Sequence, residues 1–178
     1  MIWNRSFGYL VIALFLAGSF APVHAAQEET VNAVAVIEGV GQVYEIAPGR
    51  ALFLGGFAGT IFVEDAVGAL NAGKIVCPGS LEIELEGAQQ TGSGHCIITN
   101  AEGSRIFARW DCEGVHSIGC RGNFELVGGT GEFIGISGES EFVIRSAVRE
   151  LTVDALRGEV TEAVLGLISW NQFTYRIP

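Results

Sequence analysis

The chain has 178 residues, four cysteines, 25 glycines and a formal net charge of −10. That length fits one domain. The acidic balance argues against nucleic acid as a partner, because an acidic surface repels phosphate backbones.

The N-terminal segment has the three parts of a secretory signal peptide. Arg5 supplies a positive start, an apolar run covers residues 10–20, and small residues lead to Ala25. The apolar run is shorter than the ~20 residues of a membrane-spanning helix. We therefore expect a signal peptide at 1–25, a single domain at 27–178, and a periplasmic or secreted protein that does not span the membrane. Loss of Arg5 would move the formal charge from −10 to −11.

After a polar start at 27–32, apolar and polar residues alternate along most of the chain. In the stretch 80–87, for example, Leu81, Ile83 and Leu85 alternate with glutamates, as in a strand with one dry face. The segments that predict strands are 42–48, 50–65, 80–87, 104–112, 123–129, 139–146 and 166–178. The turn signals between strands are 47–50, 71–74, 86–94, 100–103 and 128–131. Short strands separated by such turns predict an antiparallel sandwich or barrel.

Two segments leave the local structure open. The pair Gly55–Gly56 interrupts a predicted strand and suggests a bulge or a barrel corner. The stretch 146–158 has apolar residues at helical spacing and ends at Gly158, where a helix cap would lie, yet it also continues the preceding alternation. A short helix near the C-terminus and a strand are equally supported there.

All four cysteines lie in the part expected to remain after export. An even number in an exported chain predicts two disulfides, with three possible pairings. We favour Cys77–Cys96, because a hairpin turning near residues 86–87 brings the two opposite each other, and Cys112–Cys120, which close a short loop. The alternative Cys96–Cys112 needs a turn centred on Ser104, later than the turn signal there.

The stretch "GGTGEFIGISGES", residues 128–140, raises the question of a phosphate cradle. Gly129, Gly131 and Gly135 are spaced one residue too far apart for the dinucleotide fingerprint, and Glu132 would face the phosphate. We interpret the glycines as a tight hairpin with residues at positive φ.

This segment resembles the Gly-Gly-Thr-Gly-x-Phe-x-Gly hairpin of the barrel superfamily of allene oxide cyclases and dirigent proteins. The matching positions are Gly128, Gly129, Thr130, Gly131, Phe133 and Gly135. The likeness covers residues 124–142, and many exported bacterial proteins carry a similar segment. It implies an all-β fold, an antiparallel closed β-barrel of about eight strands, with a cavity suited to hydrophobic ligands and often with homo-oligomers. The hairpin is structural in those families, so the resemblance transfers no catalytic residue.

Few residues suggest chemistry. A zinc site at Cys112, His116 and Cys120, with His95 and Cys96 nearby, has the wrong spacing and is less favoured than disulfides, so we expect no metal and no cofactor. No nucleophile elbow occurs. Arg109, Asp111 and His116 form the most polar cluster near a strand end, and a ligand-binding mouth would lie there. A surface ion pair is the simpler interpretation of the same residues.

The sequence thus predicts an exported barrel that binds a small hydrophobic ligand or a partner protein and is not an enzyme. Two alternatives remain: an isomerase or cyclase of the allene oxide cyclase type, and a structural oligomer-forming protein of the envelope.

Overall fold

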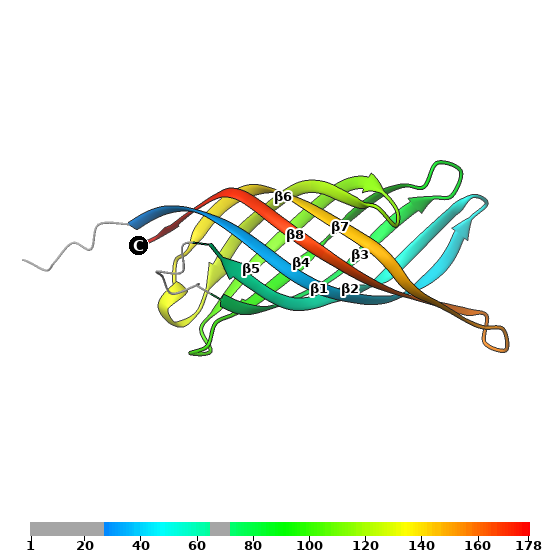
Figure 1. Ribbon diagram of the computed structural model, residues 1–178, viewed down its shortest axis with the longest axis horizontal. Helices are drawn as coiled ribbons and strands as arrows, with labels where there is room; N and C mark the ends of the chain where they lie inside the picture. Colours follow the sequence, from blue (N-terminus) through cyan, green and yellow to red (C-terminus); the bar gives the residue numbers. More distant parts are fainter. Residues whose placement is uncertain (1–26, 65–71) are drawn as a thin grey trace, which may run out of the picture.

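The computed structural model describes residues 27–64 and 72–178, which form one closed antiparallel barrel of eight strands in chain order (Figure 1). The strands are β1 (Gln27–Ala47), β2 (Arg50–Val63), β3 (Ala72–Glu84), β4 (Gln89–Thr99), β5 (Arg105–Val115), β6 (Gly119–Gly129), β7 (Ser137–Asp154) and β8 (Glu159–Ile177). The barrel closes because β8 pairs antiparallel with β1. The all-β class and the closed barrel predicted from the sequence are confirmed.

The signal peptide predicted at 1–25 lies outside the described residues. Among the residues that are described, no helix is long and apolar enough to cross a membrane.

The ambiguous segment 146–158 is a strand followed by a turn. Strand β7 continues to Asp154, and Gly158 ends the turn with a φ of 68°. The helical alternative for this segment is therefore wrong. The period-two pattern prevails because Leu151 and Val153 lie opposite residues of β8 in a regular ladder.

Several boundaries differ from the sequence-based expectation, and the turn predicted at 71–74 falls on the start of β3. The polar start at 27–32 is already part of β1, where it pairs with the end of β8. The turn predicted at 86–94 covers the start of β4 instead, since that strand begins at Gln89. Gly92 and Gly94 are strand residues whose missing side chains make room for an aromatic ring: a Cβ at Gly94 would lie 2.8 Å from Cε2 of Trp110.

The glycine pair in β2 makes no bulge. The register between β1 and β2 runs unbroken through Gly55 and Gly56, as does the register between β2 and β3. The pair is needed for close approach instead, because a Cβ at Gly55 would lie 2.4 Å from the carbonyl oxygen of Val40.

The connection between β6 and β7 is longer than the tight hairpin expected from its glycines. It contains a short 3₁₀ turn, η1 (Gly131–Phe133), in which Gly131 has a φ of 62°. The backbone N–H of Thr130 donates to the carbonyl of Arg105 at 2.8 Å, and Phe133 is buried in the core. Insertion of this aromatic ring is the physical reason that the chain needs more than a two-residue turn.

Both disulfides join neighbouring strands from inside the barrel. Cys77 of β3 pairs with Cys96 of β4, with the Cα atoms 4.1 Å apart. Cys112 of β5 pairs with Cys120 of β6, with the Cα atoms 5.8 Å apart. These are the two pairings that the turn positions favour.

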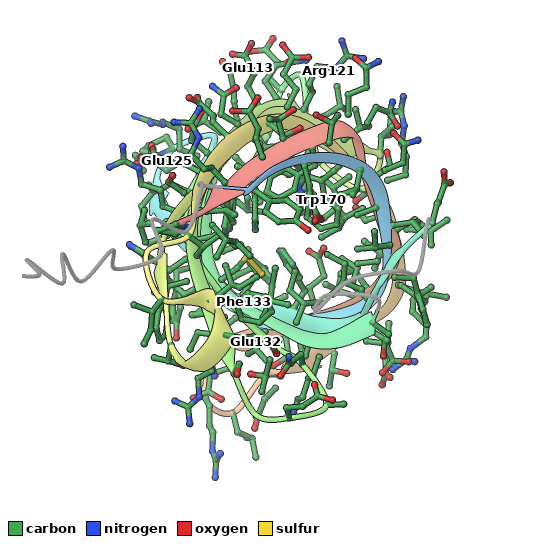
Figure 2. All side chains as sticks on the ribbon, turned by 90° about the vertical axis from the view of Figure 1, so that its left-hand side faces the viewer. Glu113, Arg121, Glu125, Glu132, Phe133 and Trp170 are labelled. Atoms are coloured by element: carbon green, nitrogen blue, oxygen red, sulfur yellow. A yellow bond between two sulfur atoms is a disulfide. The ribbon has the colours of Figure 1, made fainter. Side chains whose placement is uncertain are left out.

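One end of the barrel, where the C-terminus lies, is filled by aromatic side chains. The ring of Phe124 lies 5.3 Å from Trp170, 6.3 Å from Phe142 and 6.1 Å from Phe173, each in an edge-to-face arrangement. Figure 2 looks into this end and shows Trp170 and Phe133 inside the barrel, with Glu113 and Arg121 outside it. The interior of this end is therefore packed, and the remaining space lies toward the other end.

Candidate functional site

A cavity of about 90 Å³ lies inside the barrel and borders the aromatic cluster at Phe142. Its wall is built from the inward faces of strands on both sides of the barrel. The larger apolar side chains that line it are Ile37, Phe53, Phe57, Leu81, Phe142 and Ile144. Gly39 and Gly79 also line the cavity, and other side chains occupy the space beside them: a Cβ at Gly39 would lie 2.8 Å from Cγ2 of Val164.

Trp110 of β5 also lines the cavity and packs flat against the wall. A Cβ at Gly79 would lie 2.4 Å from its Cζ2 atom, so the ring occupies the space that a side chain on β3 would take. Its Nε1–H has no acceptor among the described residues. Trp170, in the packed end, shares that property, so the unpartnered N–H does not by itself mark a ligand site.

Three polar side chains from distant parts of the chain meet at the cavity. His116 comes from the turn between β5 and β6, Gln90 from β4 and Glu162 from β8. The Nδ1 atom of His116 lies 3.1 Å from Oε1 of Gln90, and its Nε2 atom lies 3.1 Å from Oε2 of Glu162. The residues Gln90 and Glu162 are only 6% and 5% exposed. Buried carboxylates in proteins are nearly always paired, and this one is paired with an imidazole.

Neighbouring hydrogen bonds hold the ring of His116 in place. Its backbone N–H donates to the carbonyl of Ala88 at 2.7 Å, and Nε2 of Gln90 donates to the carbonyl of Gly119 at 3.5 Å. The amide oxygen of Gln90 therefore faces Nδ1 of the ring. A neutral imidazole has one N–H and can donate to only one of the two oxygens, whereas an imidazolium donates to both. Each ring nitrogen of His116 faces one side-chain oxygen, Nδ1 that of Gln90 and Nε2 that of Glu162.

The cluster predicted at Arg109, Asp111 and His116 does not assemble. Arg109 is exposed on the outside of β5 and pairs with Glu125 at 2.5 Å, and Asp111 is exposed on the same outer face. Both border a shallow outer hollow together with His95. Only His116 turns inward. The expectation was wrong about the grouping because period-two alternation continues to Asp111, whereas His116 lies beyond the strand in the turn.

Sequence reasoning missed Gln90 and Glu162. The alternation along β8 could have indicated Glu162. It falls on the same strand face as Ile168 and Trp170, whose side chains point into the barrel. Gln90 gave no such signal, since it lies in a stretch that was interpreted as a turn. Within residues 27–64 and 72–178, no group of three histidine, cysteine or acidic side chains is placed to hold a metal ion.

At the packed end of the barrel, the pKa of one tyrosine, Tyr175, differs from its usual value. Burial raises the pKa of the Tyr175 hydroxyl well above its usual value, and the hydrogen bond that this hydroxyl donates to Glu29 raises it further.

Comparison with known proteins gives little beyond the fold. No family model and no curated protein matches the chain. Among solved structures, the chain is similar to the pterocarpan synthase dirigent protein, at 15% identity and a TM-score of 0.38, over 83% of this chain and 87% of that one. At that TM-score the two backbones superpose only loosely, so the similarity says nothing about ligand or activity.

Proposed function

We propose that the chain is an exported, non-catalytic binding protein that holds a small, mainly apolar ligand inside the barrel. The observation that carries this proposal is the interior cavity, with apolar walls and a single polar cluster formed by Gln90, His116 and Glu162. Sites for small molecules are typically concave and apolar, with a few convergent polar groups that orient the ligand.

The size of the cavity limits the ligand. A volume of about 90 Å³ is smaller than the ~150 Å³ cavity that admits benzene, and well below the ~300–1,000 Å³ of sites for drug-sized molecules. The cavity therefore fits a compact molecule, or the tip of a longer one, with a polar group directed at His116 or Glu162. A single ring fits only when side chains of the wall, such as Phe53 and Leu81, move outward.

The two disulfides support export. Both close inside the barrel, and such bonds persist in oxidising compartments rather than in the cytosol. We propose the periplasm or the extracellular space as the place of action.

A specific observation also favours a second candidate, an isomerase. His116 and Glu162 form a hydrogen-bonded acid–base pair that lines the cavity, and such a pair can exchange a proton with a molecule bound there. An isomerase would transfer deuterium from heavy water into its ligand, and the variant Glu162→Gln would stop this transfer. A binding protein would leave the ligand unlabelled.

The binding proposal is tested by filling the cavity. Val164 lines the cavity, whereas its neighbour Leu165 is 48% exposed on the outer face of β8. We expect the wild-type protein to carry a co-purified ligand in native mass spectrometry and to give a saturation-transfer NMR signal with added benzene. The variant Val164→Phe should lose both. The matched control Leu165→Phe should keep both.

Two results would contradict the proposal. One is equal binding by both variants, which would place the ligand outside the cavity. The other is the absence of any bound ligand or probe in the wild-type protein. Because Val164→Phe adds a bulky ring to the cavity wall, Ser146→Leu on the neighbouring strand β7 provides a second and smaller filling variant.

A further inference from the structure

Strand β7 extends past the strand on one of its sides. The pairing of β6 with β7 ends at Gly119 and Arg145, whereas the pairing of β7 with β8 continues to Asp154 and Glu159. Over the described chain, residues 147–154 therefore pair on one side only. Figure 1 shows the hairpin of β7 and β8 projecting from the barrel at the end opposite the C-terminus. We call residues 147–154 the open edge.

The last backbone contact on this side of β7 comes from the β5–β6 turn. The N–H of Ser146 donates to the carbonyl of Ile118 at 3.1 Å. Beyond that point the open edge presents a row of N–H and C=O groups over roughly 25 Å. Such a row is a template for an added strand.

The open edge is only partly protected against an added strand. Natural edges are blunted by charged side chains and by proline; residues 147–154 contain no lysine and no proline, but they do contain Arg149, Glu150 and Asp154. A register shift between Val148 and Glu150 also interrupts the edge, and the ladder is regular from there to Asp154.

One face of the open edge carries apolar side chains that are exposed to solvent. Leu151 lies opposite Glu162, and Val153 lies opposite Val160, so both share the face that continues into the barrel interior. They are 59% and 62% exposed. An added strand would bring apolar side chains of its own onto this face and cover them.

The charge of the surroundings decides what kind of segment fits. Two of the three arginines near the open edge have acidic partners: Arg149 lies 3.2 Å from Glu38, and Arg157 lies 3.8 Å from Asp154. The third, Arg145, is exposed just before the edge, where Glu150 and Glu159 outnumber it, and the chain as a whole carries a net charge of −10. A second copy of the chain would bring the same negative charge, whereas a basic segment is attracted.

We propose that the open edge binds an extended, basic peptide segment of another protein as an additional antiparallel strand, with alternate apolar residues of that segment packed against Leu151 and Val153. This interaction site lies outside the cavity and does not depend on a ligand within it.

The test uses a synthetic heptapeptide, acetyl-Lys-Val-Lys-Ile-Lys-Val-Lys-amide, and two N-methylated forms of it. One form is methylated at the apolar residues and the other at the central lysines. Alternate N–H groups of a strand point to opposite sides, and an added outermost strand uses one side only. We therefore expect one methylated form to bind like the parent peptide and the other to lose binding. Amide hydrogen exchange should slow within 147–154 when the parent peptide is added.

Two variants on opposite faces of the same strand complete the test. Leu151→Glu places a charge on the apolar face, and Thr152→Glu places the same charge on the other face, where Thr152 contacts Glu150. We expect the first to weaken peptide binding about tenfold or more beyond any loss caused by the second. Both positions are exposed, and thermal unfolding of each variant, measured alone, separates a loss of stability from a loss of peptide binding.

Three results would overturn the proposal. The first is equal loss of binding with both methylated peptides, or with neither. The second is exchange protection elsewhere than 147–154. The third is a dimer in sedimentation that Leu151→Glu dissociates and the peptide does not displace, which would assign the open edge to a second copy.

Discussion

The buried pair of His116 and Glu162 leads to the sharpest energetic prediction. The side chain of Glu162 is 6% exposed and that of His116 is 20% exposed. Removal of one member of a buried hydrogen-bonded pair leaves the other polar group without a partner, which costs ~1–3 kcal/mol. We expect His116→Phe to lower the free energy of unfolding by an amount in this range, about 1–3 kcal/mol.

The double variant His116→Phe, Glu162→Leu should recover most of this loss. Replacement of both partners by apolar groups removes both buried polar groups together, and such replacements are often neutral. We expect the double variant to lie within about 1 kcal/mol of the wild type, so the two changes are strongly non-additive.

Urea unfolding followed by tryptophan fluorescence measures each member of this cycle. The control is Glu141→Gln, at an exposed position, which should change stability by less than about 0.5 kcal/mol. If the single and double variants are additive, or if His116→Phe costs no more than the control, the pair contributes nothing as a unit and the described geometry of the site is refuted.

The remaining predictions concern the packed end and the framework. The pKa of Tyr175 is raised in the folded state, so the stability that this residue contributes is complete below the unfolded pKa of 10.0 and is lost as the pH rises above that value. The variant Tyr175→Phe should therefore lose less stability than the wild type above about pH 10, as measured by circular dichroism of unfolding. Loss of the β3–β4 disulfide, with a sequence separation of 19, should cost about 3 kcal/mol, and loss of the β5–β6 disulfide, with a separation of 8, should cost about 2.5 kcal/mol. The variant without the β3–β4 disulfide should therefore have the lower denaturant midpoint. Gly94→Ala should cost about 1–3 kcal/mol by pressing on Trp110, and unchanged thermal stability would show that the ring moves freely.

The fold class could be predicted because most strands alternate strictly. Residues such as Ile106, Ala108 and Trp110 share one face in the sequence pattern and are all buried in the barrel. The disulfide pairing followed from the same regularity: the β3–β4 register places Gly79 opposite Gly94, which makes Cys77 and Cys96 direct neighbours across the ladder.

The candidate site could not be predicted, because its three polar residues break local rules. Gln90 lies near the start of β4, where Gly92 and Gly94 are typical of a turn in the sequence but accommodate the ring of Trp110 in the structure. His116 lies in a turn, where alternation no longer indicates a side chain's direction. Glu162 is a carboxylate on an inward face, and the pattern alone does not show that a histidine far away in the sequence pairs with it. Each position depends on a contact between distant strands, which a single sequence does not record.

The central claim is that an apolar ligand occupies the interior of the barrel, and NMR contacts between bound benzene and protein methyl groups test it most directly. The account predicts nuclear Overhauser effects from benzene to the methyl groups of Ile37, Leu81 and Val164, which line the cavity. Contacts confined to Leu165 and Leu167 on the outer face, or no contacts at saturating benzene, would contradict it.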